Sequence, residues 1–418
     1  FRDIYINKNL SSISTLANAF VKLESCFGKV KHRYIKGEYA EKFVKLLDEK
    51  EKENNLKNSD EILGMIVLDR STYFLTPLIT NFTYEGLIDE YFGIKYGKID
   101  VKEKLLKKGP NALNEDRKND KIIKYDLTSS INSYYCILRC MLCRDVYKYI
   151  MKTRSYFSNI ASDSKKDNIK ELGEKVDTFG YYVKNVRDPL AYSENIMDYI
   201  RKFIISPDYK KFIQYEQLLI TTQLPAHLHD YYDEYLCDKK ELNKILRLMV
   251  IENITQGNIQ DYQNMKRDIL NMYGYDKIFI FKDLEQLGWL PEKGMKSPFG
   301  LSYRDIYDKL GLFKLEYNDQ KIEDCSYICD QYCPISLKLI EKAIIGKWGK
   351  INDILKKMPG YLQFPLDEKE IAKPTEQVNT IFIVFVGGVS YAEIEGIRFL
   401  NRKFMENFKK SKEKKPTR

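Results

Sequence analysis

The apolar residues along the chain change their spacing several times, and each spacing predicts a type of element. Residues 13–27 and the stretch YAEKFVKLLDEKEKENN at 39–55 carry apolar side chains at helical spacing, which predicts two amphipathic helices. A continuous apolar run at 62–68 with polar flanks predicts a buried strand. The stretch FTYEGLIDEYFGI at 82–94 predicts a helix that ends at Gly93. The beginning of the chain therefore indicates an α/β arrangement.

The middle of the chain has a different pattern. A charged stretch, KKGPNALNEDRKNDK at 107–121, predicts a loop or an edge segment. Residues 127–315 then give one amphipathic helical pattern after another. In that region only KIFIFKDLEQLGWL at 277–290 resembles a strand. This part of the chain predicts a helical domain.

A second strand-like run, at 380–386, follows helical patterns near the end of the chain. A single strand at each end of a helical block cannot bury both of its faces, so we expect the flanking regions to join in one parallel-type α/β sheet. The predicted domains are a central α/β domain made of residues 1–105 and 324–418, and a large helical domain inserted at 106–323. The predicted fold class is α/β plus all-α.

Composition narrows the possible functions only a little. The chain has 418 residues, 44% hydrophobic and 31% charged, which is typical of a globular protein. The net charge is 69 − 60 = +9, and residues 401–418 carry +6 of it, because eight Lys or Arg face two Glu there. The rest is nearly neutral, so we expect no nucleic-acid partner and interpret the basic tail as a solvated end.

Three further observations concern the compartment in which the chain acts and the completeness of its sequence. No apolar run approaches the roughly 20 residues that cross a bilayer. Eight cysteines without regular intervals indicate free thiols in the reducing cytosol. The first residue is Phe1 rather than Met, so we expect a fragment whose true start lies upstream.

Several stretches imitate sites without meeting their chemical requirements. Cys136, Cys140 and Cys143 have an interval compatible with an iron–sulfur cluster, but they are predicted to share one face of an apolar helix. HLHDYYDEYLC at 227–237 offers three zinc ligands where structural zinc takes four. GWLPEKGMKS at 288–297 resembles a P-loop, but Met295 stands where the lysine belongs. We therefore predict no metal and no cofactor.

Two strand ends remain as candidates for chemistry. Asp69 and Arg70 follow the first strand, and Gly387 and Gly388 follow the last and open a helix whose amides could receive an anion. One interpretation is a nucleotide-dependent enzyme on an α/β sheet. The other is structural: an ion pair that fixes the loop after Arg70, and a tight turn that requires glycine. The second is favoured, because no further carboxylate or histidine is nearby in sequence.

Two long motifs carry a family resemblance. LDRSTYFLTPLITNFTYEGLIDEYFGI at 68–94 resembles the D-R-x-x-D-x-x-T-P-L and T-Y-(E/Q)-(G/A)-L signature of the SM family of syntaxin-binding, Sec-like proteins. FVGGVSYAEIEGIRFL at 385–400 resembles its G-G-V-T-(Y/F)-A-E-I-x-x-L-R-F-L. The segment YEGLIDE resembles the vacuolar and lysosomal branch. The matching motif residues, expected to be structural, are Asp69, Arg70, Thr76, Pro77, Gly387, Gly388, Glu393 and Arg398.

The resemblance also has departures from the family pattern. Tyr73 stands where the family has an Asp, so we expect that loop to be held differently, and KGMKSPFG at 293–300 replaces a family segment of the type GGRNNYP. The resemblance implies a three-domain arch whose amino-terminal domain is largely missing here, together with a last strand beyond Arg418.

The resemblance implies protein binding rather than catalysis. The implied function is to bind and template SNARE bundles for membrane fusion in vesicle-mediated transport, at late endosomes, lysosomes or vacuoles. An SM protein of another trafficking step is an alternative. The implied SNARE-binding hairpin lies at about 145–187, and its contact candidates are Lys148, Lys152, Arg154 and Lys184. A solvated charged face is the competing explanation for each of them.

A second contact is implied with vacuolar protein sorting-associated protein 16, in the HOPS and CORVET tethering complexes. The motif MKRDILNMYGYDKI at 265–278, within a tether-binding part at about 240–315, places this contact on Lys266, Tyr275 and Ile278. An aromatic residue beside an aliphatic one is a plausible anchor. The alternative, held nearly even, is that Tyr275 and Ile278 pack under the strand predicted after them.

Overall fold

The computed structural model describes residues 2–59, 61–106, 121–128, 134–162, 177–178, 180–182, 185–291, 302–314, 322, 324–368 and 380–413. The chain divides into two compact units. Unit 1 comprises residues 1–79, 212–326 and 331–418, and unit 2 comprises 80–211 and 327–330. Residues 80–105, which we assigned to the central domain, thus lie in unit 2, and residues 212–323, which we assigned to the helical domain, lie in unit 1.

The central sheet of unit 1 joins the two ends of the chain. Its strands are β1 (Arg33–Lys36), β2 (Ile62–Asp69), β6 (Thr380–Val386) and the short β5 (Leu362–Gln363), in the order β5-β1-β2-β6. β1 and β6 both run parallel to β2, with Ile66 opposite Ile383, and β5 is antiparallel to β1. The prediction that segments more than 300 residues apart close one α/β sheet is confirmed. The four-residue β1 was missed.

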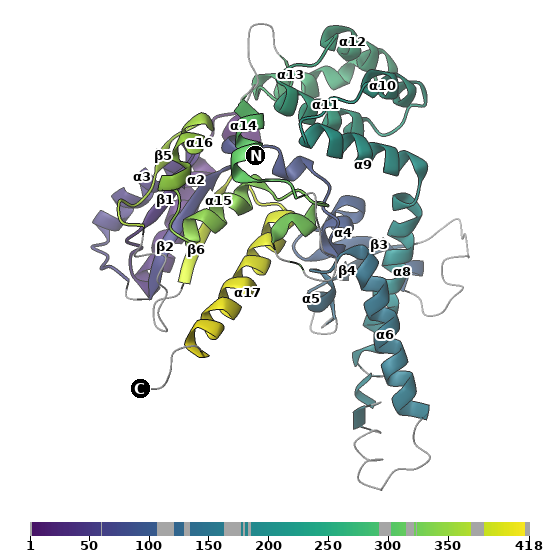
Figure 1. Ribbon diagram of the computed structural model, residues 1–418, viewed down its shortest axis with the longest axis horizontal. Helices are drawn as coiled ribbons and strands as arrows, with labels where there is room; N and C mark the ends of the chain where they lie inside the picture. The colour runs from purple at the N-terminus through teal and green to yellow at the C-terminus, as the bar shows by residue number, and fades with distance from the viewer. Residues whose placement is uncertain are drawn as a thin grey trace. The chain divides into compact units, whose positions relative to one another are not determined.

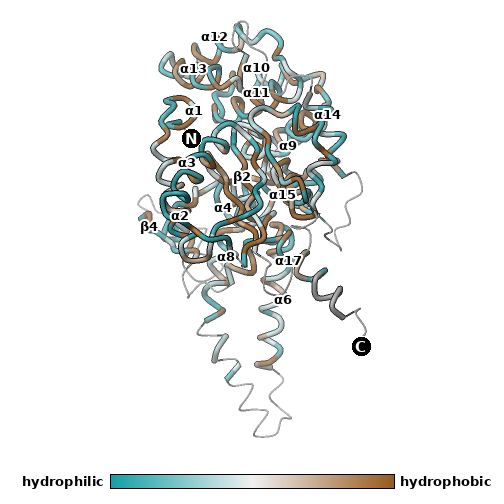
Figure 2. The backbone as a smooth tube through the Cα atoms, turned by 90° about the vertical axis from the view of Figure 1, so that its left-hand side faces the viewer, coloured by the Kyte–Doolittle hydropathy of each residue, from teal (hydrophilic) through white to brown (hydrophobic). Residues whose placement is uncertain are grey.

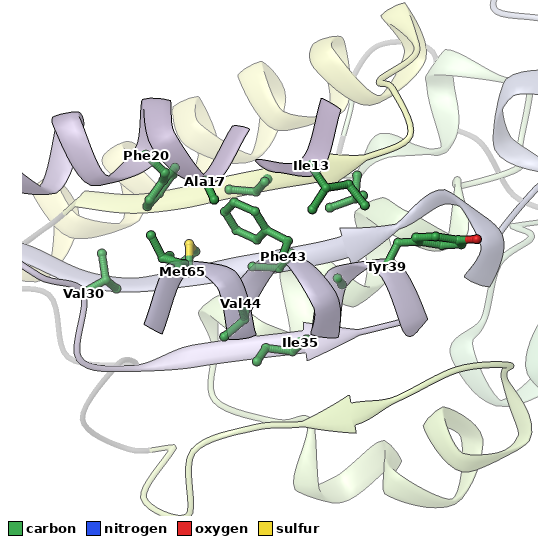
Figure 3. Close-up of a cluster of buried hydrophobic side chains, with 14 of the residues drawn as sticks. Ile13, Ala17, Phe20, Val30, Ile35, Tyr39, Phe43, Val44 and Met65 are labelled. Carbon is green, nitrogen blue, oxygen red and sulfur yellow. The ribbon is translucent and has the colours of Figure 1, made fainter. Parts of the chain in front are cut away.

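The main core of unit 1 lies between this sheet and helices α2 (Ser11–Phe27) and α3 (Glu38–Glu53). Figure 3 shows Phe20 and Phe43 pointing into it from the two helices, and their rings meet edge to face with centroids 5.9 Å apart. All eight residues of β2 are buried, and the strand is mostly brown in Figure 2. An apolar run covered on both faces is what a central parallel strand requires.

The other elements of unit 1 are mainly helical (Figure 1). They are α1 (Arg2–Tyr5), η1 (Arg70–Thr72), η2 (Thr76–Leu78), α10 (Leu228–Cys237), α11 (Leu242–Gln256), α12 (Tyr262–Tyr273), η5 (Tyr275–Lys277), α13 (Ile278–Gln286), α14 (Ser302–Leu310), η6 (Cys325–Ile328), α15 (Ile335–Ile344), η7 (Gly349–Ile351), α16 (Asn352–Lys357) and α17 (Tyr391–Glu413). Two of the unit boundaries, 211/212 and 326/327, fall within α9 (Pro207–Ile220) and η6.

The strand predicted in KIFIFKDLEQLGWL is wrong, because residues 275–286 form η5 and α13. A short apolar run has no periodicity that separates a strand from a helix. Within the run IFIF only Phe281 is buried. One buried position in four is the spacing of a helix that packs by a single stripe.

Unit 2 is built around a second core that joins helices to a two-stranded sheet. Its elements are α4 (Tyr84–Phe92), β3 (Lys98–Lys102), η3 (Glu103–Leu106), β4 (Ile122–Asp126), α5 (Tyr135–Leu138), α6 (Cys143–Ser162) and α8 (Arg187–Ile204). β3 and β4 are antiparallel. The Gly93 stop of α4 is confirmed.

The helix predicted to carry all three cysteines of C-x3-C-x2-C is wrong. α5 ends at Leu138 and α6 begins at Cys143, so Cys140 lies in the turn between them. The loop predicted at 107–121 lies almost wholly outside the described residues.

Candidate functional site

Asp69, the acid at the end of β2, is fully buried and holds the start of the chain against the sheet. Its carboxylate accepts hydrogen bonds from the phenol of Tyr5, from the Ser71 amide (2.9 Å) and from the Tyr39 amide at the start of α3 (2.7 Å). Burial, followed by the charge of Asp69, raises the pKa of Tyr5. The phenol therefore keeps its proton and acts as a donor.

Arg70 makes a separate set of contacts, so Asp69 and Arg70 are not the ion pair considered from the sequence. Its guanidinium binds both carboxylate oxygens of Glu393, at 3.0 and 2.6 Å, and the carbonyl oxygen of Gly388 at 2.7 Å. The side chains of this pair are 4% and 0% exposed. A buried bidentate pair of this kind fixes the geometry of both partners. Arg70 thereby ties the end of β2 to the loop after β6.

Glu393 also closes the amino-terminal end of α17. Its carboxylate accepts from the Ser390 amide and hydroxyl, each at 2.9 Å, and its own amide donates to the Ser390 hydroxyl at 3.3 Å. This reciprocal arrangement is a capping box. Gly387 and Gly388 precede it with φ of 98° and 107°, and a Cβ on Gly387 would lie 2.3 Å from the Tyr5 hydroxyl oxygen. The turn therefore requires glycine.

We call Tyr5, Asp69, Arg70, Ser390 and Glu393 the strand-end anchor. One amide at the start of each of two helices is already bound by an anchor carboxylate: the Tyr39 amide by Asp69 and the Ser390 amide by Glu393. The Arg70 guanidinium is already bound by Glu393 and the Gly388 carbonyl. These contacts support a structural role for the residues that resembled a catalytic pair.

The other motif residues lie close to the anchor in sequence but have different surroundings. Thr76 is buried and Pro77 exposed at the start of η2. Arg398 lies 3.5 Å from the buried carboxylate of Glu395. Tyr73, which departs from the family pattern, is fully buried, and the Arg70 guanidinium lies 4.8 Å from its ring centre. The loop is thus held by a ring beneath Arg70.

Lys36, a residue that the sequence did not single out, is a further anchor at the same edge of the sheet. Its ammonium is buried at the end of β1 and donates to the carbonyl oxygens of Met358 and Gly360, each at 2.9 Å. Burial lowers its pKa to about 8. Only the folded chain brings these carbonyls to β1, so sequence spacing carried no signal for it.

The SNARE-contact candidates on α6 differ in side-chain exposure and in ion pairing. Lys148 has a side chain 76% exposed and only a 3.4 Å contact with Asp145, and Lys152 is exposed. Arg154 forms an ion pair with Glu194 of α8 at 2.5 Å, which joins the two helices. Lys184 lies outside the described residues.

The two exposed lysines lie beside apolar residues that the sequence analysis did not name. Tyr147 and Met151 are 38% and 41% exposed and lie one turn apart on the helix. Val146 and Ile150, on another side of α6, are fully buried. We call Tyr147, Lys148, Met151 and Lys152 the α6 face. It is an apolar track with a basic rim. The i, i+4 spacing of Tyr147 and Met151 is the sequence pattern from which this face could have been predicted.

The tether candidates lie on α12, η5 and α13. Tyr275 is 70% exposed and Ile278 is 40% exposed, so the alternative in which they pack under a following strand is wrong. Phe279 and Ile280 beside them are 68% and 38% exposed. We call Tyr275, Ile278, Phe279 and Ile280 the α13 surface. Phe279 and Ile280 were missed because the run IFIF was interpreted as a buried strand.

The Lys266 side chain is engaged in contacts within the protein and is not available as an exposed contact residue. Its ammonium lies 2.6 Å from the carboxylate of Glu285 and 5.6 Å from the ring centre of buried Phe281. Tyr262 also donates to the Glu285 carboxylate, at 2.5 Å. These contacts hold α13 against α12 and so present the α13 surface outward.

The described part of the chain also bears on metal sites and membrane-spanning helices. Within it, no group of three or more His, Cys, Asp or Glu side chains is arranged to hold a metal ion. No helix among those residues is both long and apolar enough to cross a membrane.

Comparison with known proteins places the chain in a family. The model of the Sec1 family matches residues 1–413. The chain belongs to the Sec1 family. The SM-family resemblance carried by the two motifs is thereby confirmed, and relatives within the Sec1 family agree with the vacuolar branch. The chain is 26% identical over 419 residues to vacuolar protein sorting-associated protein 33A of Rattus norvegicus, covering 96% of this chain and 68% of that protein.

Other members support the same placement. The chain is 23% identical over 430 residues to the vacuolar protein-sorting-associated protein 33 homolog of Arabidopsis thaliana, again covering 96% of this chain and 68% of that protein. Among solved structures, "SM Protein Vps45 in Complex with Qa SNARE Tlg2" matches with a TM-score of 0.61 at 11% identity, over 94% of this chain and 66% of that one. The predicted Sec-like fold is confirmed, and the chain spans about two thirds of these Sec1-family relatives.

Proposed function

We propose that this protein binds syntaxin-like SNARE helices and templates their assembly for membrane fusion. The vacuolar sorting relatives and the fold shared with an SM protein in complex with a Qa SNARE support this proposal. The hairpin at about 145–187 is the proposed receptor, and α6 provides most of its described part. Lys148 and Lys152 remain SNARE-contact candidates, whereas Arg154 would support the hairpin indirectly, because its ion pair with Glu194 joins α6 to α8.

The observation that carries the proposal is the α6 face. Tyr147 and Met151 repeat at i, i+4 and are exposed, with lysines beside them, while the other side of the helix is buried. An amphipathic partner helix binds to such a track through its own apolar stripe, and its acidic residues meet the basic rim. The partner's charge pattern is thus part of the proposal.

We further propose that the α13 surface binds vacuolar protein sorting-associated protein 16 within a HOPS or CORVET complex. Four exposed apolar side chains within six residues of η5 and the start of α13 form an apolar patch, which is unusual for a surface that faces only water. Tyr and Ile side chains of this kind are typical interface anchors. The protein would then act in the cytoplasm, peripheral to late endosomal, lysosomal or vacuolar membranes.

The proposed activity is binding without catalysis. The strand-end anchor supports this, since Asp69 already accepts from the Tyr39 amide and Arg70 already binds Glu393 and the Gly388 carbonyl. Measurable ATP hydrolysis that disappears in Asp69→Asn would contradict it.

Binding of an immobilised syntaxin-like SNARE by the full chain tests the proposal. The double variant Tyr147→Asp with Met151→Asp is expected to weaken binding by about tenfold or more, because charged side chains replace interface anchors. The matched control is Tyr156→Asp. Tyr156 is 59% exposed on the same helix, and it lies about half a turn round from Tyr147. Equal loss in both variants, or no loss in either, would contradict the α6 face.

A further inference from the structure

A tight turn in unit 2 presents an aromatic residue to solvent. Lys95 and Lys98 exchange backbone hydrogen bonds of 2.8 and 3.0 Å around the two-residue turn Tyr96-Gly97. Both turn residues have positive φ, 52° and 74°, as the tight two-residue turn requires. The Gly97 carbonyl accepts from the Leu127 amide at 2.9 Å, which holds the turn against the end of β4. We call Lys95–Lys98 the Tyr96 turn.

Tyr96 contributes nothing to the fold that would account for its presence. Its side chain is fully exposed, at 101% of the reference area, so it gains no burial. Its left-handed backbone costs a non-glycine residue roughly 1 kcal/mol, and Asn or Gly is favoured there. An aromatic residue therefore stands at a position where neither packing nor backbone conformation favours it. Its apolar ring is available to something outside the chain.

The Tyr96 turn itself carries two lysines, while the strands behind it, β3 and β4, carry charges of both signs. Lys95 and Lys98 flank the ring, and Lys98 has only a 3.9 Å contact with Asp126. Among the residues that the structure describes, Lys95 has no ion pair. Farther from the turn, exposed Lys102 and Lys124 lie near exposed Asp100, which is opposite Lys124 in the register of β3 and β4, so the basic character is confined to Lys95 and Lys98. These two lysines would attract an anionic partner.

A second group of aromatic rings lies where α4 runs into the turn. Tyr91 stacks on Phe203 with ring centroids 5.0 Å apart, and Phe92 lies 5.3 Å from Tyr199, so the ends of α4 and α8 share one aromatic cluster. Phe203 is 41% exposed. In Figure 1, α4, β3, β4 and α8 lie together within unit 2. The Tyr96 turn thus projects from a firm base rather than from a loose loop.

We propose that the Tyr96 turn binds the surface of an anionic bilayer, with the Tyr96 ring in the headgroup region and Lys95 and Lys98 against lipid phosphates. A partner helix or peptide needs a groove to lie in, whereas a turn tip is a protruding point. An amphipathic aromatic ring between ammonium groups is the composition that membrane interfaces favour. This contact goes beyond the proposed SNARE and tether binding and uses none of their residues.

Flotation of the full chain with phosphatidylcholine vesicles, with and without phosphatidylserine, tests the proposal. Binding is expected only with phosphatidylserine. Lys95→Glu should reduce it by about fivefold or more, because one basic residue near an anionic surface contributes about 1 kcal/mol. Tyr96→Asn should reduce it by a similar factor. Since Asn suits the turn better than Tyr, this variant should be at least as stable as the original chain.

The matched controls lie in unit 1. Lys350→Glu makes the same charge change at another exposed lysine, and Tyr361→Asn makes the same ring deletion at a tyrosine that is 39% exposed. Both should leave flotation unchanged. Absence of binding to phosphatidylserine vesicles, or binding that survives Tyr96→Asn and Lys95→Glu, would overturn the proposal.

Insertion itself is tested by Tyr96→Trp with brominated lipids. The expected result is quenching of the added indole fluorescence beyond that of the native Trp289 and Trp348. Soluble glycerophosphoserine should compete weakly, because it offers the phosphate without a surface. Full competition by that compound without quenching would show a free phosphate site and overturn the bilayer proposal. Loss of SNARE binding in the α6 variants would leave this result unaffected, so the two proposals fail separately.

Discussion

The strand-end anchor and the α13 surface both lie in segments that match family motifs, but their side chains are in opposite environments. In the anchor, Asp69, Arg70 and Glu393 are charged, buried and supplied with partners from segments far apart in sequence. On the α13 surface, Tyr275 and Phe279 are aromatic and exposed. Burying a charge costs free energy unless it is paired, and exposing an aromatic ring gains none. The first region therefore holds the fold, and the second is free for a partner.

The largest expected effect is at the anchor. Arg70→Met leaves the buried Glu393 carboxylate with only its Ser390 contacts, so the free energy of unfolding should fall by about 3–5 kcal/mol. The double variant Arg70→Met with Glu393→Gln should recover part of that loss, because no uncompensated charge remains. Urea unfolding at neutral pH measures both. A single variant within about 1 kcal/mol of the original chain would mean that the pair does not hold the loop.

Glu252 is a buried carboxylate with fewer partners than Glu393, so it tests what a poorly paired buried charge does to stability. Glu252 on α11 accepts from the Tyr232 phenol at 3.1 Å and lies 3.9 Å from the partly exposed His229. Burial raises its pKa to about 7. The unfolded chain releases this proton near the ordinary value of 4.5, whereas the folded chain keeps it. Stability from this group is therefore highest at low pH and falls as pH rises from about 4.5 to about 7.

Glu252→Gln removes that ionisation while keeping an acceptor for Tyr232. Between pH 4.5 and 7 the original chain should lose on the order of 2–3 kcal/mol more stability than the variant, at about 1.4 kcal/mol per pKa unit. Unfolding free energies measured across this range give the difference. Parallel curves for the two proteins would show that Glu252 is ionised in the folded state.

Substitutions on the α13 surface should weaken partner binding and leave stability almost unchanged, which is the reverse of the effect expected at the anchor. Tyr275→Asp with Ile278→Asp should weaken binding of vacuolar protein sorting-associated protein 16 by about thirtyfold, or roughly 2 kcal/mol, with little change in stability. Lys266→Met is the informative neighbour, because its pair with Glu285 orients α13 from beneath. It should lower stability and binding together. Undiminished binding by a folded double aspartate variant would remove this surface from the interface.

The smallest expected effect is at the cap of α17. Ser390→Ala removes one half of the capping box and should lower the free energy of unfolding by about 1 kcal/mol. Ser155→Ala, at an exposed position within α6, should change it by less than about 0.5 kcal/mol. Thermal or urea unfolding of both variants checks the difference. Equal effects would mean that the Ser390 contacts add nothing beyond helix propensity.

The local sequence pattern was sufficient to predict a helix or strand where one physical signal dominated. The apolar run at 62–68 predicted β2, the helical spacing at 39–55 predicted α3, and Gly93 ends α4 as expected. The sequence SYAE at 390–393 is itself a readable capping box. Where the signal was short it failed, as with the four-residue β1 and with IFIF in α13.

By itself, the sequence determined the family, through two motifs, and the pairing of two distant segments in one sheet, because lone apolar strands must be covered. The tertiary structure alone decided which charges meet. Asp69 binds Tyr5 and the start of α3, while its neighbour Arg70 binds Glu393. It also decided that Tyr275 and Tyr96 face solvent. Burial and partner choice depend on residues brought together from across the chain, and spacing within one segment holds no record of them.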